Sequence, residues 1–161
     1  MFLHLCRWLQ DNSMIAALNG TAWTAALLEI VHYFSMFILV GSMLIVDLRV
    51  LGLVARRLDP TLLAARLFTW MWISLLFNFL SGFFMFAGSA TAYYHNDIFY
   101  DKLAVVLLAI VVSIIVQQKV RSWTQLPAMP AWAKLMAVVS IGLWIGAIIA
   151  GVEVPALTGV G

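Results

Sequence analysis

The sequence predicts an all-α integral membrane protein: a four-helix bundle of membrane-spanning helices with an amphipathic interfacial helix at its N-terminus. Of its 161 residues, 65% are hydrophobic and 10% are charged, whereas a soluble domain is about half apolar and about a quarter charged. The mean hydropathy is +1.04. Four stretches also reach the roughly 20 apolar residues that a helix needs to cross a hydrocarbon core of about 30 Å.

We place the four spans at residues 22–46, 67–88, 98–117 and 135–152. With their connections they form one membrane domain, residues 21–161. Residues 1–20 precede it, and their apolar side chains can share one side of a helix or of two short turns, as in a segment that lies in the membrane interface. Arg7 stands inside the short apolar run and not before it, which argues against a cleaved signal peptide.

Lysine and arginine set the expected orientation. The connections between spans one and two and between spans three and four hold most of these residues: Arg49, Arg56, Arg57, Arg66, Lys119, Arg121 and Lys134. Connections rich in Lys and Arg face the cytoplasm. The chain is therefore expected in a bacterial inner membrane with both termini in the periplasm.

A polar layer is expected in the outer leaflet. His32 lies 14 residues from Val46, the inner end of its span, and Lys102 lies 14 residues from Val116. Both therefore lie about 21 Å from the inner end at about 1.5 Å per residue. The same count on the other two spans reaches Ser81 and Ile149, each beside small residues. Ionisable residues at such depth are costly and indicate a functional site.

Glu29, His32, Met36 and Met43 follow one another at spacings of three, four and seven residues, so one helix face carries a carboxylate, an imidazole and two thioethers. Imidazole and thioether groups bind haem iron and copper, and a nearby carboxylate can orient the imidazole. A structural interpretation stays open: His32 and Glu29 as a buried pair, the methionines as core residues, and Lys102 reaching the interface beside an aspartate.

Other polar residues have simpler expectations. Asn78, near the middle of the second span, is expected to make an interhelical hydrogen bond. His95 lies in the outer loop, where it is either solvated or a second imidazole for the site. Cys6 is the single cysteine, so no internal disulfide forms.

Small residues and helix breakers complete the pattern. Gly142, Gly146 and Ala150 recur every four residues and form a stripe for close helix contact or for the face of a flat cofactor. Asp59 and Pro60 are typical of a helix N-cap and first helical position.

Three segments carry a family resemblance: "HYFSMFILVGSMLIVDLRVLGL" (32–53), "SGFFMFAGSATAYYHNDIFYDKL" (81–103) and "SIGLWIGAIIAG" (140–151). Their order resembles a family of small bacterial membrane proteins of unknown function with a "DLRLLG"-type motif. That family is distantly similar to the membrane domain of copper-resistance D proteins and to the protoporphyrinogen oxidase J group. The resemblance implies that His32 is an axial ligand of haem b and that Lys102 is a second ligand or a propionate partner. Where the oxidase group has a further histidine, this chain has Val116 and Gln117, so porphyrinogen oxidation is not implied.

Three functions follow as hypotheses. The first is a b-type haem or redox module that exchanges electrons with a quinone or a periplasmic protein, with His32, Lys102 and Glu29 at the cofactor. The second is copper handling through Glu29, His32, Met36 and Met43, with His32 and Met36 as the main metal ligands. The third is a structural or accessory subunit of a larger membrane complex, for which no cofactor is required. No nucleophile lies at usable spacing from a base, so the chain is not expected to be an enzyme by itself. Nucleic-acid binding is not expected, because the net charge of +2 follows from topology.

Overall fold

The computed structural model describes residues 2–55, 57–123, 125–126 and 128–158 and is 86% helical. Within these residues it has seven helices and no strand. Four helices are long and apolar enough to cross a membrane, which confirms the predicted fold class. The helices are α1 (Phe2–Gln10), α2 (Ser13–Asn19), α3 (Ala22–Val50), α4 (Pro60–Gly88), α5 (Ala90–Tyr94), α6 (Asp97–Trp123) and α7 (Ala131–Thr158).

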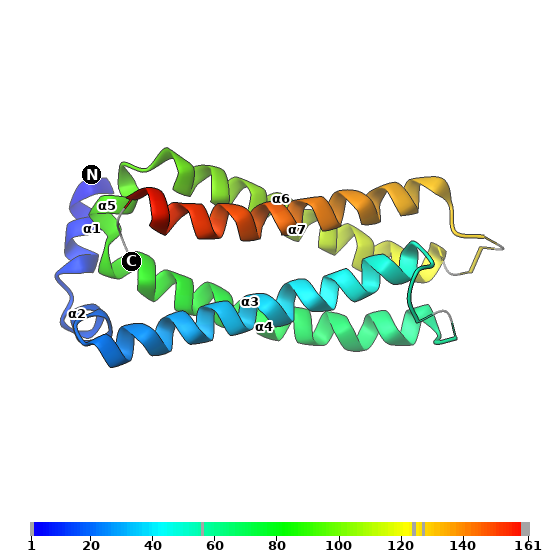
Figure 1. The fold of residues 1–161 in the computed structure, drawn as a ribbon, viewed down its shortest axis with the longest axis horizontal. Coiled ribbons are helices and arrows are strands. Elements are labelled where there is room, and N and C mark those ends of the chain that lie inside the picture. Colours follow the sequence, from blue (N-terminus) through cyan, green and yellow to red (C-terminus); the bar gives the residue numbers. More distant parts are fainter. Residues whose placement is uncertain (1, 56, 124, 127, 159–161) are drawn as a thin grey trace.

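The long helices form two antiparallel pairs (Figure 1). Helix α3 packs most extensively on α4 and α6 on α7, and the contact between α3 and α7 is the main joint between the pairs. The short helices α1, α2 and α5 lie together at one end of the bundle, where the chain begins and α7 ends. We call this the N-terminal end.

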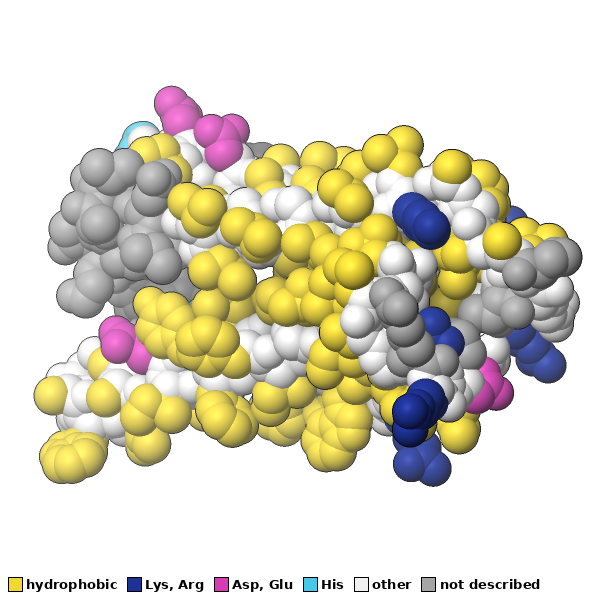
Figure 2. Space-filling view, turned by 45° about the vertical axis from the view of Figure 1, so that its right-hand side comes forward, with side chains coloured by type: hydrophobic (Ala, Val, Ile, Leu, Met, Phe, Trp, Pro, Cys, Tyr) yellow, Lys and Arg dark blue, Asp and Glu magenta, His cyan; other side chains and the backbone are white. Residues whose placement is uncertain are grey.

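Lysines and arginines gather at the other end, which we call the basic end (Figure 2). Its described basic residues come from the ends of the long helices and the loops between them: Arg49, Arg57, Arg66, Lys119, Arg121 and Lys134. Between the two ends, the surface of the bundle is dominated by exposed apolar side chains such as Phe34, Trp70 and Ile149. A surface of this kind suits a multi-pass membrane protein, because these side chains can face lipid.

The tightly packed core lies toward the basic end and in the middle of the bundle. Its fully enclosed members include Met43, Met71 and Val116, from three different helices. On α3, no described residue before Ser35 is buried, and on α6 none before Ala109 is buried. The N-terminal half of the bundle is therefore more loosely packed than the basic half.

Local chemistry explains where the helices begin. Asp59 caps α4 by accepting a hydrogen bond from the Thr61 N–H at 2.8 Å, and Pro60 occupies the first turn, as predicted. Thr21 caps α3 in the same way through the Thr24 N–H. At the other end, α3 continues four residues past the expected inner end at Val46, to Val50.

The glycine stripe of α7 does not make the close helix contact that its spacing predicts. A Cβ atom added at Gly142 would meet nothing within 4 Å, and one at Gly146 would only approach Val105 at 3.7 Å. The buried face of α7 instead carries Ala133, Ala137, Ser140, Trp144 and Ala147. Alanine and serine are also small enough for close packing. Because their face of α7 is the one that packs into the core, the glycines lie on a different side of the helix.

Candidate functional site

The imidazole of His32 is held between α3 and α4. Its Nδ1 lies 3.1 Å from the backbone carbonyl oxygen of Asn78 and 3.1 Å from the hydroxyl oxygen of Ser81. A carbonyl oxygen only accepts hydrogen bonds, so Nδ1 carries the proton and donates it. In the neutral imidazole, Nε2 then keeps its lone pair and can act as a base or as a metal ligand.

Asn78 of α4 also binds the backbone of α3 through its side chain. The Asn78 side-chain NH₂ donates to the His32 carbonyl oxygen at 2.9 Å and reaches the Ser35 hydroxyl at 3.4 Å. The predicted interhelical hydrogen bond of Asn78 is therefore confirmed. His32 and Asn78 therefore each donate a side-chain hydrogen bond to the backbone carbonyl of the other, and this pair of bonds joins α3 to α4.

Small groups let the two helices approach at this point. Ser81 is buried and donates to the carbonyls of Phe77 and Asn78 in its own helix, at 2.7 and 3.1 Å. The next residue, Gly82, lies directly against the imidazole, because a Cβ atom there would be 3.0 Å from its Cε1. The ring is thus fixed by two contacts at Nδ1 and by the bare backbone of Gly82.

Lys102 enters the same layer from α6. Its Nζ would lie 3.7 Å from a Cβ atom at Gly151 of α7, and its charge interacts with His32. Among the described residues it makes no hydrogen bond or ion pair, and both Asp97 and Asp101 are exposed. The structure therefore places His32 beside Ser81 and Gly82, and Lys102 beside Gly151, which are the pairings that the residue counts predict.

The other members of the predicted ligand face lie in different surroundings. Glu29 is exposed, Met36 is half-buried, and Met43 is fully enclosed in the core. The four residues share one side of α3, but α3 leaves the packed core before it reaches Glu29. His95, at the end of α5, is exposed with its ring edge-on to Tyr94. Within the described part of the chain, no three His, Cys, Asp or Glu residues gather as a metal site.

A groove runs past the site on the surface of the bundle. Its volume is about 270 Å³, and its walls come from α2, α3 and α4. Ser81 is its deepest-lying polar member, since it is buried and also contacts His32. The residues that line the groove are Leu18, Thr24, Leu27, Leu28, Val31, Phe77, Leu80, Ser81 and Phe84.

Asp47 is a candidate that the sequence reasoning missed. It follows Val46 directly, where we expected the first span to end, but α3 continues and encloses its side chain completely. The helical spacing held a signal, because Asp47 lies four residues after Met43 and three before Val50, which are both core residues. A lone carboxylate at core spacing could have been recognised as buried.

Comparison with known proteins places the chain in a family. The model of a family of unknown function, DUF6644, matches residues 12–155, and the chain therefore belongs to this family. No curated protein and no solved structure matches the chain. The expected similarity to copper-resistance D proteins and to the protoporphyrinogen oxidase J group has no support among these comparisons and stays a prediction.

Proposed function

We propose that the chain, as a member of this family, is an integral membrane redox module that binds haem b through Nε2 of His32. The observation that carries the proposal is the hydrogen bond from Nδ1–H to the Asn78 carbonyl. Histidines that bind metals almost always donate their other ring N–H to a carbonyl or carboxylate, which fixes the tautomer and the ring orientation. The protein alone gives His32 this arrangement, through the Asn78 carbonyl.

The residues around His32 fit such a group. Haem supplies reversible one-electron transfer when its iron has axial ligands from the protein. Lys102 has no anionic partner among the described residues. As an ammonium it would suit a haem propionate, and as the neutral amine, after losing its proton, it would serve as a second ligand. The loose packing of α3 and α6 in this half of the bundle leaves side chains that can rearrange around a flat molecule.

The groove beside Ser81 suits an apolar redox partner such as a quinone. Seven of its nine lining residues are Leu, Val or Phe, and the other two, Thr24 and Ser81, carry hydroxyl groups, of which that of Ser81 lies beside His32. An apolar groove with few polar groups is typical of sites that bind an apolar molecule in one orientation. A periplasmic redox protein at the N-terminal end is the other candidate partner.

The orientation belongs to the same proposal. Lys and Arg gather at the basic end (Figure 2), and the positive-inside rule assigns that end to the cytoplasm. His32 then lies in the outer leaflet of a bacterial inner membrane, and the termini lie in the periplasm. Fusing a reporter that is active only in the periplasm after residue 20, and separately between α6 and α7, tests this orientation.

The absorption spectrum of the purified chain tests the haem proposal. We expect a Soret band that shifts on reduction and is lost in His32→Ala, while His95→Ala, which changes an exposed histidine, keeps it. Circular dichroism should show that both variants remain helical. A colourless preparation from cells supplied with haem precursors would overturn the proposal, as would a band that survives in His32→Ala.

The accessory-subunit function remains the second candidate. Apart from short loops and α1, α2 and α5, the described chain is made of its four long helices, and these expose many large apolar side chains, among them Phe37 and Phe79. Such surfaces bind either lipid or other membrane subunits. Purification in mild detergent should then yield a stable complex with other membrane proteins. Copper handling is less favoured, because Glu29 and Met43 lie in different surroundings from His32.

A further inference from the structure

We propose that Asp47 of α3 and Ser140 of α7 form a proton-binding site near the basic end, in which the Asp47 carboxyl is held as the neutral acid. This site is separate from the His32 layer. Asp47 lies fifteen positions after His32 on α3, which corresponds to about 22 Å along the helix. It also lies at the contact between α3 and α7, the main joint between the two helix pairs.

The carboxyl is fully enclosed. Both Asp47 and Ser140 have an exposed fraction of 0%. The Ser140 hydroxyl lies beside the carboxyl, yet no hydrogen bond reaches either Asp47 oxygen or the Ser140 oxygen. Buried polar atoms without partners are rare in folded proteins, and each one calls for a bound group or an explanation.

Ser140 differs from three other buried serines of the bundle. Ser74, Ser81 and Ser113 each donate to the carbonyl of the residue four positions earlier in their own helix. Such bonds satisfy a serine that is buried in a helix. Since Ser140 makes none, its hydroxyl is free to interact with the Asp47 carboxyl.

No positive charge is placed to neutralise Asp47. Arg49 on the same helix donates to the Leu58 carbonyl, and α2, which also packs on α3, carries no ionisable residue. The basic residues of the neighbouring long helices near this end are exposed, and none of them forms a hydrogen bond with Asp47 among the described residues. These residues are Arg66 on α4, Lys119 and Arg121 on α6, and Lys134 on α7. Lys102, at the other end of α6, is half-buried beside Gly151.

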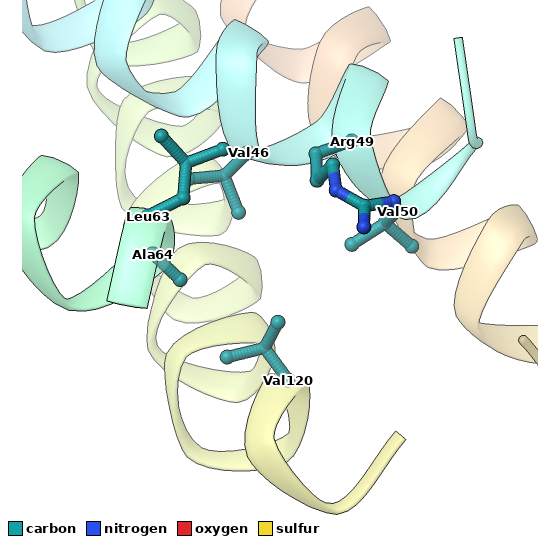
Figure 3. Close-up of a pocket in the computed structure, with 6 residues that line it drawn as sticks. All are labelled: Val46, Arg49, Val50, Leu63, Ala64 and Val120. Carbon is teal, nitrogen blue, oxygen red and sulfur yellow. The ribbon is translucent and has the colours of Figure 1, made fainter. Parts of the chain in front are cut away.

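The surroundings of Asp47 on α3 are apolar, and a metal ion does not fit them. Asp47 lies between Met43, Val46 and Val50, which are all buried. On the side of α3 that faces α4 and α6, Val46, Arg49 and Val50 line a pocket with no space wide enough for a water molecule, and Figure 3 shows these lining residues. A hard cation needs about six or more oxygen ligands, whereas Asp47 and Ser140 offer three oxygen atoms.

A proton suits a carboxyl that is fully enclosed, has no cation beside it and offers too few oxygen atoms for a metal ion. It converts an unpaired buried charge into a neutral acid, and an ionised carboxylate without a partner is the most costly state at this depth. The acid O–H can donate to the Ser140 oxygen. Release of the proton leaves the carboxylate at Asp47, so the number of protons balances.

Infrared spectroscopy of the whole chain in lipid vesicles tests the site. At neutral pH we expect the C=O stretching band of a protonated carboxylic acid, which moves on transfer to D₂O and disappears in Asp47→Asn. The amide has nearly the same shape as the neutral acid, so this variant should fold. Asp59→Asn is the matched control, because Asp59 is exposed and Asn also caps helices.

A second pair of variants keeps the test decisive if Asp47→Asn does not fold. Ser140→Ala should shift the acid band, because the acid loses its neighbour, while Ser113→Ala, a buried serine bonded to Trp144, should leave it in place. No acid band in the wild-type chain at neutral pH would overturn the proposal. So would a band that neither Asp47→Asn nor Ser140→Ala changes.

Discussion

The imidazole of His32 and the α-carbon of Gly82 lie so close that no side chain fits between them. A Cβ atom at Gly82 would be 3.0 Å from Cε1 and 3.3 Å from Nδ1 of the ring. The ring has little freedom to move away, because Nδ1 is bonded to both Asn78 and Ser81. Gly82 is therefore part of what fixes the orientation of His32.

Gly82→Ala should displace the imidazole. Overpacking a well-packed contact costs about 1–3 kcal/mol, and here the contact must be relieved by a ring that would lose its Nδ1 hydrogen bonds. We expect reduced stability in detergent unfolding and, where haem is bound, a shifted or weakened Soret band.

Gly142→Ala is the control for this substitution. A Cβ atom at Gly142 would meet nothing within 4 Å, and replacing a glycine inside a helix by alanine removes a penalty of about 0.5–1 kcal/mol. This variant should be as stable as the wild type or slightly more stable. Equal loss of stability in both variants would show that Gly82 has no special relation to His32.

Asn78→Ala should loosen α3 from α4 without removing the carbonyl that binds His32. The side-chain hydrogen bond to the His32 carbonyl is lost, and single interhelical hydrogen bonds in membranes contribute about 0.6 kcal/mol on average and up to about 1.7 kcal/mol. We expect a loss in that range, measured by reversible unfolding in mixed micelles. Because the Nδ1–H bond goes to the backbone of Asn78, the ligand properties of His32 should change less than in Ser81→Ala.

Depth and periodicity predicted the His32 layer because both depend only on helical geometry. Counting 14 residues from the ends of the spans was enough to bring His32 level with Ser81 and Lys102 level with Gly151. The cap at Asp59 was predictable for a similar reason, since capping is local. These features need no knowledge of how the helices pack.

Packing decided the features that the sequence did not reveal. Spacing placed Glu29 and Met43 on the same side of α3 as His32, but the helix pairs make tight contact only around Met43. The glycines of α7 had the right spacing for a contact face, yet the helix packs into the core through the neighbouring face of alanines and serine. Asp47 was missed because the end of the span was placed at Val46, one residue before it.

Asp59→Ala should destabilise the start of α4. The Asp59 carboxylate accepts a hydrogen bond from the Thr61 N–H, and replacing such a cap by alanine costs about 0.5–2 kcal/mol. We expect faster amide hydrogen exchange in the first turn of α4 and a matching loss of stability. Asp59→Asn, which retains a capping oxygen, should restore both, and a failure of asparagine to do so would indicate that charge and not capping matters at this position.

Tyr93, outside the membrane-spanning helices, should ionise only at unusually high pH. Burial is the main cause that raises its pKa, and the neighbouring Tyr33 and Glu29 raise it further. Because the unfolded chain loses this proton near the ordinary value of about 10, the contribution of Tyr93 to stability is fully present below that pH. It is lost as the pH rises through the higher pKa of the folded chain.

Glu29→Gln tests the electrostatic part of this shift. Removing the negative charge should lower the pKa of Tyr93 part of the way toward its ordinary value, because burial, the larger cause, remains. Nuclear magnetic resonance of ring-labelled tyrosine resolves the titration of Tyr93 from those of the other three tyrosines. Asp101→Asn, which removes an exposed charge that does not act on Tyr93, should leave the titration unchanged. An unchanged titration in Glu29→Gln would mean that Glu29 points away from Tyr93 in the membrane.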